Sequence, residues 1–262
     1  ADGVVLSTGG YIAYHPSKVP YQYVSRHLNG GDLFGEAVER ARSRGMSVIA
    51  RTDPHAMHQE SYEAHPEWAM VQVDGKARLH WSMSGAWVTC ALGPYNFEFM
   101  NEVNCEIVRE YGVDGLFGNR WAGSGFCYCD NCRENFREFS GIELPTIHSM
   151  TEPAYRQYLI WREQRLFNLW KLWDDAIRAI KPESHYIPNS GGGALSHLNM
   201  KMAAERAEIL FADRQSRRGT MMPWASGMNA KEFRATMGDK PVGGIFSVGI
   251  EEPHRWKDSV QT

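Results

Sequence analysis

Short apolar runs that alternate with longer amphipathic segments constrain the fold of this chain more than any other feature. Helical segments separate the runs, and strand–helix–strand units with short joints place their strands side by side in parallel. The sequence therefore predicts an α/β fold with a parallel sheet. Six runs have the length and composition of buried strands: Val4–Leu6, Val48–Ala50, Gly115–Phe117, His185–Ile187, Ile209–Ala212 and Val242–Val248.

Four segments between the runs carry apolar residues three or four positions apart, which is the spacing of one helix face. In the first segment, Phe34 and Val38 begin such a stripe after Asp32, which can cap the helix. Gly45 can end it. The other predicted helices cover residues 100–111, about 153–180 and 200–207.

Six predicted strands are two fewer than a closed (β/α)8 barrel contains, which leaves two architectures open. Either the chain is a (β/α)8 TIM barrel that lacks its first and last strand, or the sheet is open and wound on both faces. The sequence has no repeat, low-complexity stretch or linker, so we expect a single domain over residues 1–262. Most single domains have fewer than about 300 residues, so the length permits this interpretation.

The composition argues against two classes of protein. The chain has 28 Lys and Arg against 31 Asp and Glu, a net charge of −3, and this balance speaks against binding to nucleic acid. No run approaches the roughly 18 apolar residues of a membrane span, so we expect a soluble protein. The chain begins at Ala1 without Met, which indicates a trimmed or processed piece and leaves the compartment unknown. Assembly into a homo-oligomer stays open.

Three of the five cysteines lie within six positions, a spacing typical of a metal-binding or redox loop. Cys127, Cys129 and Cys132 form a C-x-C-x-x-C sequence, and Zn²⁺ takes four ligands, so a fourth must come from elsewhere. Cys90 follows an apolar stretch, whereas Cys105 lies mid-helix and is expected to pack as a small apolar side chain. We therefore predict a closed structural zinc site of Cys90 and the three loop cysteines; the alternative is a loop of unpaired thiols.

Polar, charged and aromatic residues follow the predicted strands at the points where the strands end. The carboxyl ends of parallel strands meet at one edge, and that edge holds the active site in parallel α/β folds. The alternative is that these loops are simply polar. The candidate ligand-binding residues at this edge are Arg51, Asp53, His55, Asn119, Trp121, Asn189 and Arg214.

The cysteine loop has a wider context in the sequence. Together with His65–Trp68 and Val88–Tyr95, it resembles the zinc-bearing barrel of glycoside hydrolase family 42 β-galactosidases. Gly30–Phe34 and Asp114–Phe117 look more like the α-L-fucosidase-related barrels. Over nearly its whole length the chain is most similar to the hypothetical glycosyl hydrolase 6 domain, which shares traits of both. The resemblance implies a carbohydrate substrate, a structural zinc ion and a chain that holds barrel strands two to seven.

One position departs from the pattern of these relatives. They carry a carboxylate at the end of the fourth barrel strand, often Asp just before Asn, and here Gly118 precedes Asn119. In a fucosidase-like mechanism that carboxylate is the nucleophile, and in the family 42 pattern it is the acid/base. Three explanations stay open: a natural non-catalytic relative, an engineered replacement of Asp by Gly, or an alignment that is off by a few residues.

The resemblance implies glycoside hydrolysis, which needs two carboxyl groups across the scissile bond. The candidates at other strand ends are Asp213, which precedes Arg214, and the pair Glu251 and Glu252 after the last strand. The second hypothesis is a non-catalytic carbohydrate-binding pseudo-enzyme, which Gly118 favours. A nucleotide-binding sheet is rejected, because the chain lacks both the G-x-G-x-x-G order and the Lys of a P-loop.

Overall fold

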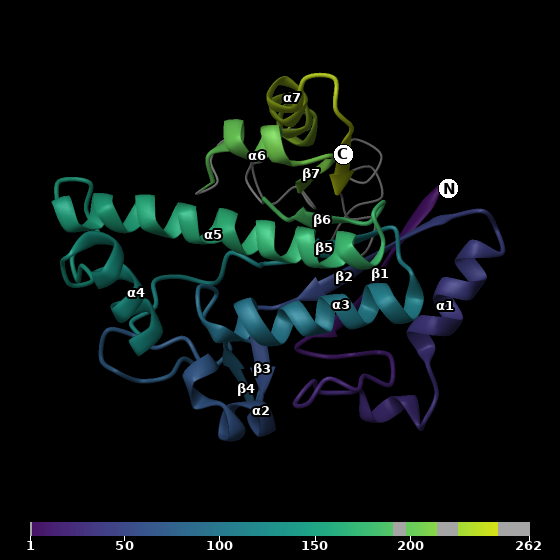
Figure 1. Ribbon diagram of the computed structural model, residues 1–262, viewed down its shortest axis with the longest axis horizontal. Helices are drawn as coiled ribbons and strands as arrows, with labels where there is room; N and C mark the ends of the chain where they lie inside the picture. Colours follow the sequence, from purple (N-terminus) through teal and green to yellow (C-terminus); the bar gives the residue numbers. More distant parts are fainter. Residues whose placement is uncertain (1, 191–197, 214–224, 246–262) are drawn as a thin grey trace. The chain divides into compact units, whose positions relative to one another are not determined.

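A computed structural model of the chain describes residues 2–190, 198–213 and 225–245. The backbone forms two compact units, one of Ala1–Tyr186 and one of Ile187–Thr262. Figure 1 shows the helices and strands of both units, coloured along the sequence.

A four-stranded sheet forms the centre of the first unit (Figure 1). β2 pairs in parallel with β1 on one side and with β5 on the other, so the carboxyl ends of these three strands lie at one edge. The predicted α/β fold with a parallel sheet is thereby confirmed. The strands lie in the order β1 (Gly3–Gly10), β2 (Ser47–Asp53), β5 (Gly115–Gly118) and β6 (His185–Pro188).

Three helices of this unit connect the strands as crossover connections require. α1 (Leu33–Arg42) lies between β1 and β2 in the sequence and contacts both strands. α3 (Met100–Tyr111) precedes β5, and α5 (Pro153–Ile180) precedes β6. α3 packs against part of the longer α5, as Figure 1 shows. The helical segments predicted from apolar spacing are therefore present in this unit.

The ends of these helices follow from single residues. The Asp32 side chain accepts a hydrogen bond of 2.8 Å from the Gly35 N–H and caps α1 as predicted. Gly112 ends α3 at φ +57°, a left-handed conformation that glycine adopts without a Cβ clash. Pro153 begins α5, where its fixed φ suits the first helical turn and its missing N–H costs nothing.

Several short elements were not predicted from the sequence. β3 and β4 form an antiparallel pair of three residues each, which is too short to show an alternating pattern. These elements are β3 (Ala56–His58), α2 (Gln59–Ala64), β4 (Ala86–Val88), α4 (Asp130–Ser140), 3₁₀ turns at Arg26–Leu28 and Pro66–Trp68, and a π-helical turn at Tyr95–Phe99 that leads into α3.

The second unit contains a two-stranded parallel sheet of β7 (Leu210–Asp213) and β8 (Val242–Ile245). α6 (Met200–Arg206) precedes β7, and α7 (Ala225–Met237) lies between the two strands in the sequence. The last predicted strand extended to Val248, and its final residues lie outside the described part of the chain. In that part the strands form separate parallel sheets, and they do not by themselves show a closed barrel.

Tryptophan side chains fill the space between α5 and the neighbouring strands of the first unit. Trp170 and Trp173 are fully buried, and each would bury on the order of 150–250 Å² on folding. Their indole N–H groups also find partners: Trp170 Nε1 donates to the Tyr186 carbonyl at 3.2 Å, and Trp173 Nε1 donates to the Asn96 carbonyl at 2.8 Å. These contacts fix α5 to β6 and to the turn before α3.

A buried polar network holds the long connection between β1 and α1 against α3. The Glu106 carboxylate on α3 accepts hydrogen bonds from Ser17 Oγ at 2.5 Å and from the Lys18 N–H at 2.6 Å. His15 Nε2 lies 3.2 Å from the same carboxylate, and Thr8 Oγ1 lies 2.6 Å from His15 Nδ1. Burial raises the pKa of Glu106, but the hydrogen bonds from His15, Ser17 and Lys18 outweigh it and lower the pKa overall.

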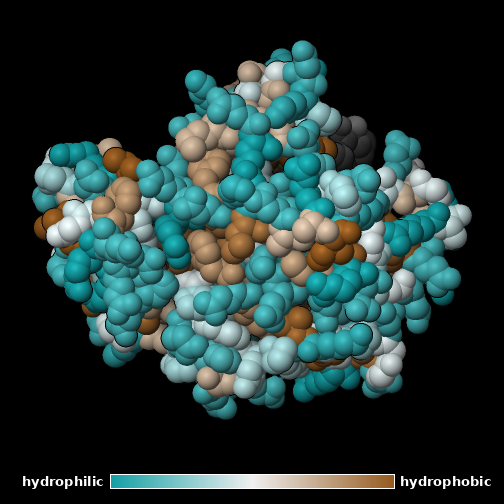
Figure 2. Space-filling view, in the orientation of Figure 1, coloured by the Kyte–Doolittle hydropathy of each residue, from teal (hydrophilic) through white to brown (hydrophobic). Residues whose placement is uncertain are grey.

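The surface in Figure 2 is largely hydrophilic, and hydrophobic residues are scattered over it. Among the described residues, no helix is long and apolar enough to cross a membrane.

Candidate functional site

Asp53 lies at the carboxyl end of β2 and is the centre of a polar cluster in the first unit. Its side chain is about nine-tenths buried, and its Oδ1 atom accepts hydrogen bonds from Arg51 Nη2 at 3.0 Å and from Asn119 Nδ2 at 2.5 Å. His55 Nδ1 lies 3.9 Å from the same oxygen. Within the described chain, Oδ2 has no hydrogen-bond partner, so it can accept one from a ligand. The structure thus brings together four of the predicted ligand-binding residues.

The backbone of β1 and β2 holds Asp53 in place. The Tyr11 N–H donates a hydrogen bond of 3.1 Å to the Asp53 carbonyl. Gly10 lies directly against that carbonyl at φ +81°, and a Cβ on Gly10 would lie 2.3 Å from the Asp53 oxygen. Only glycine permits this approach. The Gly9–Gly10 pair after the first predicted strand therefore has a specific role, because it positions the end of the neighbouring strand.

Burial sets the protonation of the cluster. Burial raises the pKa of Asp53 from its ordinary value of 3.8, and the charge of Arg51 and the hydrogen bond from Asn119 offset only part of this rise. Burial also lowers the pKa of His55 to about 3, helped by the nearby charges of Arg120, His80 and Arg51. His55 is therefore a neutral imidazole at physiological pH.

A second group of side chains extends this cluster toward solvent. His80 stacks on Trp81 with ring centroids 3.9 Å apart, and His55 lies 5.8 Å from the same indole. The Arg120 guanidinium lies over Trp81, 4.9 Å from the ring centroid. Trp81 is 48% exposed, so about half of this side chain remains accessible to a ligand.

The two histidines each carry a buried nitrogen atom without a partner among the described residues: His55 Nδ1 and His80 Nε2. The Ser82 and Met83 N–H groups donate to His80 Nδ1 at 3.2 and 3.1 Å, so a neutral His80 carries its proton on Nε2. Buried polar atoms in native proteins nearly always have a partner, and a bound ligand or water can supply it.

Asp213 and Asn189, two further predicted site residues, lie together in the second unit. Asn189 follows β6, and Asp213 is the last residue of β7. Asn189 Nδ2 donates a hydrogen bond of 2.8 Å to Asp213 Oδ2. This contact holds the carboxylate at the carboxyl end of its strand, where the sequence placed it.

The other predicted residues have different positions. Arg214, Glu251 and Glu252 lie outside the described residues. Trp121 is fully buried, and its ring contacts Trp170 and other aromatic side chains of the core. Its ring is therefore closed to solvent in this structure, and its assignment as a ligand-binding residue stays a prediction.

Tyr186 occupies the space beside Gly118, the position at which the sequence resemblance implies a carboxylate. A Cβ on Gly118 would lie 1.6 Å from the Tyr186 hydroxyl oxygen and 2.5 Å from Cζ. Tyr186 is 2% exposed, and its hydroxyl has no hydrogen-bond partner within the described part of the chain. An Asp at position 118 would therefore require Tyr186 to move, which argues against a simple replacement of Asp by Gly in an otherwise unchanged site.

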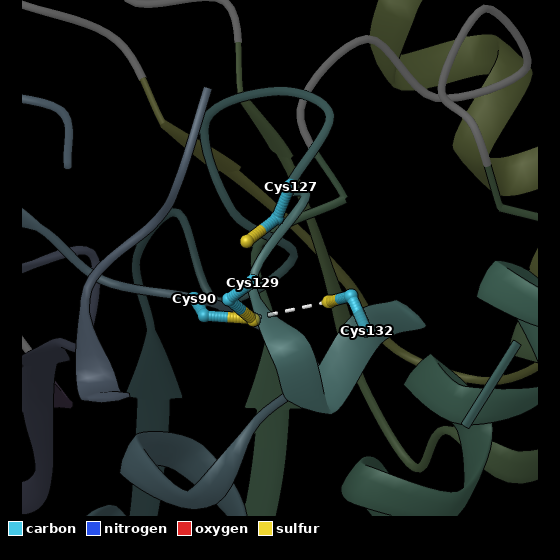
Figure 3. A group of neighbouring side chains, drawn as sticks. All are labelled: Cys90, Cys127, Cys129 and Cys132. Atoms are coloured by element: carbon cyan, nitrogen blue, oxygen red, sulfur yellow. Dashed lines mark hydrogen bonds between the residues drawn. The ribbon is translucent and has the colours of Figure 1, made fainter. Parts of the chain in front are cut away.

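Four cysteine thiols meet in a buried cluster, shown in Figure 3. The sulfur atoms of Cys90, Cys127, Cys129 and Cys132 all lie within 4.8 Å of one another, and Cys90 Sγ is 3.4 Å from Cys132 Sγ. Four thiolates around one tetrahedral ion, each at about 2.3 Å from it, would lie roughly 3.8 Å apart. The cluster therefore has the size and donor set to hold a metal ion. Cys105 is a half-buried residue of α3 and is not part of it.

Local features of the loop affect whether these cysteines are thiols or thiolates, the form that binds a metal ion. Cys129 is the N-cap of α4 and Cys132 lies in its first turn, where the helix dipole favours negative charge. The Val71 N–H donates to Cys127 Sγ at 3.4 Å. Hydrogen bonds among the thiols lower the pKa of Cys127 and raise the pKa of Cys90 and Cys132. The helix dipole and the Val71 N–H each favour a thiolate over a thiol.

Sequence reasoning missed His80 and Arg120 as members of the Asp53 cluster. His80 comes from a loop before β4, an element with no periodic signal. Arg120 has φ +53°, which is uncommon for a residue with a side chain. Its position directly after Asn119, at the end of a predicted strand, was the signal that could have placed it at this edge.

Comparison with protein families supports the resemblance read from the sequence. Residues 1–120 match the family described as Hypothetical glycosyl hydrolase 6. This range includes Asp53, Asn119 and Arg120, and it ends before the cysteine loop. No curated protein matches the chain in sequence.

Solved structures of several glycosidases are similar to the chain. An α-L-fucosidase, isoenzyme 2 from Paenibacillus thiaminolyticus, is 18% identical with a TM-score of 0.57, covering 94% of this chain and 40% of that one. The β-galactosidase from Marinomonas ef1 is 14% identical with a TM-score of 0.66, covering 96% and 50%. Gan42B, a GH42 β-galactosidase from G. stearothermophilus, is 15% identical with a TM-score of 0.63, covering 88% and 39%.

These similarities concern the fold, since the identities are low, and the chain spans half or less of the length of each of these proteins. The resemblance found in the sequence is confirmed: residues 1–120 match the Hypothetical glycosyl hydrolase 6 family, and most of the chain shares the fold of GH42 β-galactosidases and of an α-L-fucosidase.

Proposed function

We propose that this chain is the greater part of a (β/α)8 barrel, one domain over residues 1–262, that hydrolyses a glycosidic bond. The observation that carries the proposal is the Asp53 cluster at the carboxyl ends of β2 and β5. A buried carboxylate, a guanidinium and an amide converge there beside a half-exposed indole, and this set of groups suits the hydroxyls and apolar face of a sugar. The family match and the fold of the neighbours support the same conclusion.

The hydrolytic step requires two carboxyl groups. A separation of about 5–5.5 Å favours retention of configuration, and about 6.5–9.5 Å favours inversion. We propose Asp213 as one of them, with Glu251 and Glu252 as candidates for the second. In the first unit, Arg51, Asp53, His55 and Asn119 would hold the sugar. In the second unit, Asn189 and Arg214 are the candidate ligand-binding residues beside Asp213. In this scheme Asn189 orients the Asp213 carboxylate through the hydrogen bond described above.

The second candidate function is a carbohydrate-binding protein without catalysis. The contact between Gly118 and Tyr186 favours it, because it leaves no room for the carboxylate that the sequence resemblance implies at this position. The Asp53 cluster fits both functions, since binding requires the same groups.

We propose that the four cysteines hold one structural zinc ion. Four thiolates complete a tetrahedral shell and leave no coordination position for substrate, so the ion would stabilise the loop rather than take part in the reaction. This role agrees with the burial of all four side chains.

The experiment combines a hydrolysis screen with a binding screen on the full chain. Aryl α-L-fucosides and β-galactosides test for turnover, and a panel of neutral and acidic oligosaccharides tests for binding. Asp53→Asn should weaken binding at least about tenfold, because a buried charged hydrogen bond is lost. Asp213→Asn should abolish turnover and leave binding largely intact. Asp175→Asn, an exposed residue of α5 paired with Lys171, is the matched control.

The outcomes separate the two functions. Turnover that Asp213→Asn abolishes supports hydrolysis. Binding that depends on Asp53, with no turnover of any glycoside, supports the non-catalytic function. Absence of both turnover and saccharide binding would contradict the two together.

A further inference from the structure

The charges of the Asp53 cluster do not balance. Arg51 and Arg120 both lie near the single carboxylate of Asp53, and Arg78 adds a third positive charge near His80. The two imidazoles contribute no charge when neutral. The Arg51 guanidinium is paired with Asp53 at 3.0 Å, which neutralises that carboxylate and leaves an excess of positive charge. Such a site attracts an anion.

The Arg120 guanidinium forms no ion pair within the described part of the chain. No Asp or Glu among the described residues lies within ion-pair distance of its guanidinium, which lies over the Trp81 ring, 4.9 Å from the centroid. The side chain is exposed, so its hydrogen-bond donors are available to a ligand. A planar guanidinium presents a fork of donors that matches the two oxygens of a carboxylate or sulfate.

The backbone conformation of Arg120 is also unusual. At φ +53° it is one of three residues other than glycine with positive φ in the described chain. The Gly123 N–H donates to the Arg120 carbonyl at 3.1 Å and closes this turn. A strained conformation at a strand end is typical of a functional position.

The two buried histidine nitrogen atoms provide an independent indication of a ligand at the same place. His55 and His80 are each more than nine-tenths buried, and their rings lie 5.5 Å apart beside Trp81. His80 Nε2 is a donor with no acceptor in the described structure. An oxygen atom of a ligand would satisfy it.

We propose that the saccharide bound at the Asp53 cluster carries an anionic group, and that Arg120 holds this group against Trp81 and selects acidic sugars over neutral ones. The inference rests on the proposed carbohydrate site and adds the substrate class. The anion can be the carboxylate of a uronic acid or the sulfate ester of a sulfated sugar, because both offer coplanar or forked oxygen atoms to a guanidinium.

The test is a comparison of matched saccharides by isothermal titration calorimetry on the full chain. Galacturonic and glucuronic oligosaccharides, their neutral galactose and glucose counterparts, and galactose 6-sulfate derivatives form the panel. We expect the acidic ligand to bind about tenfold or more tightly than its neutral counterpart at low salt, and this preference to shrink as salt increases. The carboxylate and sulfate arms distinguish the two sources of charge.

Substitutions at Arg120 test whether this residue causes the preference for acidic saccharides. Arg120→Asn removes the charge, and Asn tolerates positive φ, so the fold should be retained. It should reduce the binding of acidic ligands to about the level of neutral ones. Arg120→Lys keeps the charge without the fork and should retain part of the preference. Arg44→Gln, an exposed residue before β2 at the opposite end of that strand, is the control and should retain all of it.

The results distinguish this inference from the proposed function. Equal binding of acidic and neutral saccharides, or a preference that survives Arg120→Asn, overturns the inference and leaves the carbohydrate site standing. If no saccharide of either kind binds, the proposed function fails and this inference fails with it.

Discussion

The contact between Gly118 and Tyr186 permits a quantitative test of why this chain lacks a side chain at the end of β5. In Gly118→Ala the new methyl group would start 1.6 Å from the Tyr186 hydroxyl oxygen. The oxygen must retreat by about 1.4 Å before the contact reaches even 3.0 Å. We therefore expect a loss of stability at or above the upper end of the range for overpacking, about 3 kcal/mol.

Tyr186 has little freedom to make that retreat. Its ring lies 4.8 Å from Trp173 and 6.2 Å from Trp121, both fully buried. Its N–H donates to Asp174 Oδ1 at 2.9 Å, and its carbonyl accepts from Trp170 Nε1. Because the main chain and the ring are both held, the strain cannot be relieved by a simple rotation of the side chain.

Tyr186→Phe is the informative partner substitution. It removes a buried hydroxyl that has no hydrogen-bond partner in the described structure, so alone it should be neutral or stabilise the chain by about 1 kcal/mol. In the double variant Cζ, at 2.5 Å, becomes the nearest atom, so the methyl group is still crowded but less severely. A double-mutant cycle should therefore give a favourable coupling of about 1 kcal/mol.

Urea denaturation followed by circular dichroism measures all four proteins. Gly227→Ala in α7 is the matched control, because a Cβ there meets nothing within 4 Å and Ala favours a helix. A Gly118→Ala variant as stable as the starting protein, or a coupling of zero, would refute this reasoning.

Two further predictions concern buried polar groups. Native protein should contain about one zinc ion per chain, and Cys129→Ser or a strong chelator should lower the melting temperature. Cys105→Ser is the control and should not lower it. An unchanged melting temperature or substoichiometric metal counts against the zinc site. Glu106→Gln should cost about 1.5–3 kcal/mol at pH 7, with exposed Glu102→Gln as the control. Because the native pKa of Glu106 is lowered from 4.5, its contribution is present above that pH and should disappear as the pH falls below it; a difference independent of pH down to acid unfolding would contradict this.

The sequence was sufficient to predict the elements whose signal is local and repeated. The strands of the parallel sheet lie at the short apolar runs of the sequence. β5 is buried along its whole length, as a central parallel strand requires. α1 and α3 follow from apolar residues on one face, with Asp32 and Gly112 at their ends. In each case the neighbouring residues alone determine the conformation.

Other features depend on contacts between distant residues and could not be read in this way. A tryptophan after a strand has the same sequence signal whether its ring is exposed or buried. The ring of Trp121 is buried among Trp170, Trp173 and Tyr186, which come from distant parts of the sequence. Likewise, Gly118 looked like a lost carboxylate, whereas its neighbour in space is the Tyr186 hydroxyl, 68 positions along the chain. The pairing of β3 with β4, which brings His80 near His55, has no periodic signature.

The segment after β5 links the proposed zinc site to the proposed ligand site. It carries Arg120 at its start and Cys127 seven residues later. A 2.7 Å hydrogen bond from Arg78 Nη1 to the Ser124 carbonyl ties it to the loop that bears His80. An ion held at Cys127 would therefore restrain both segments of the ligand site, the one that carries Arg120 and the one that carries His80. We expect chelation to weaken saccharide binding at temperatures where the fold persists by circular dichroism. If affinity is unchanged after complete removal of the metal, the ion stabilises the loop without shaping the site.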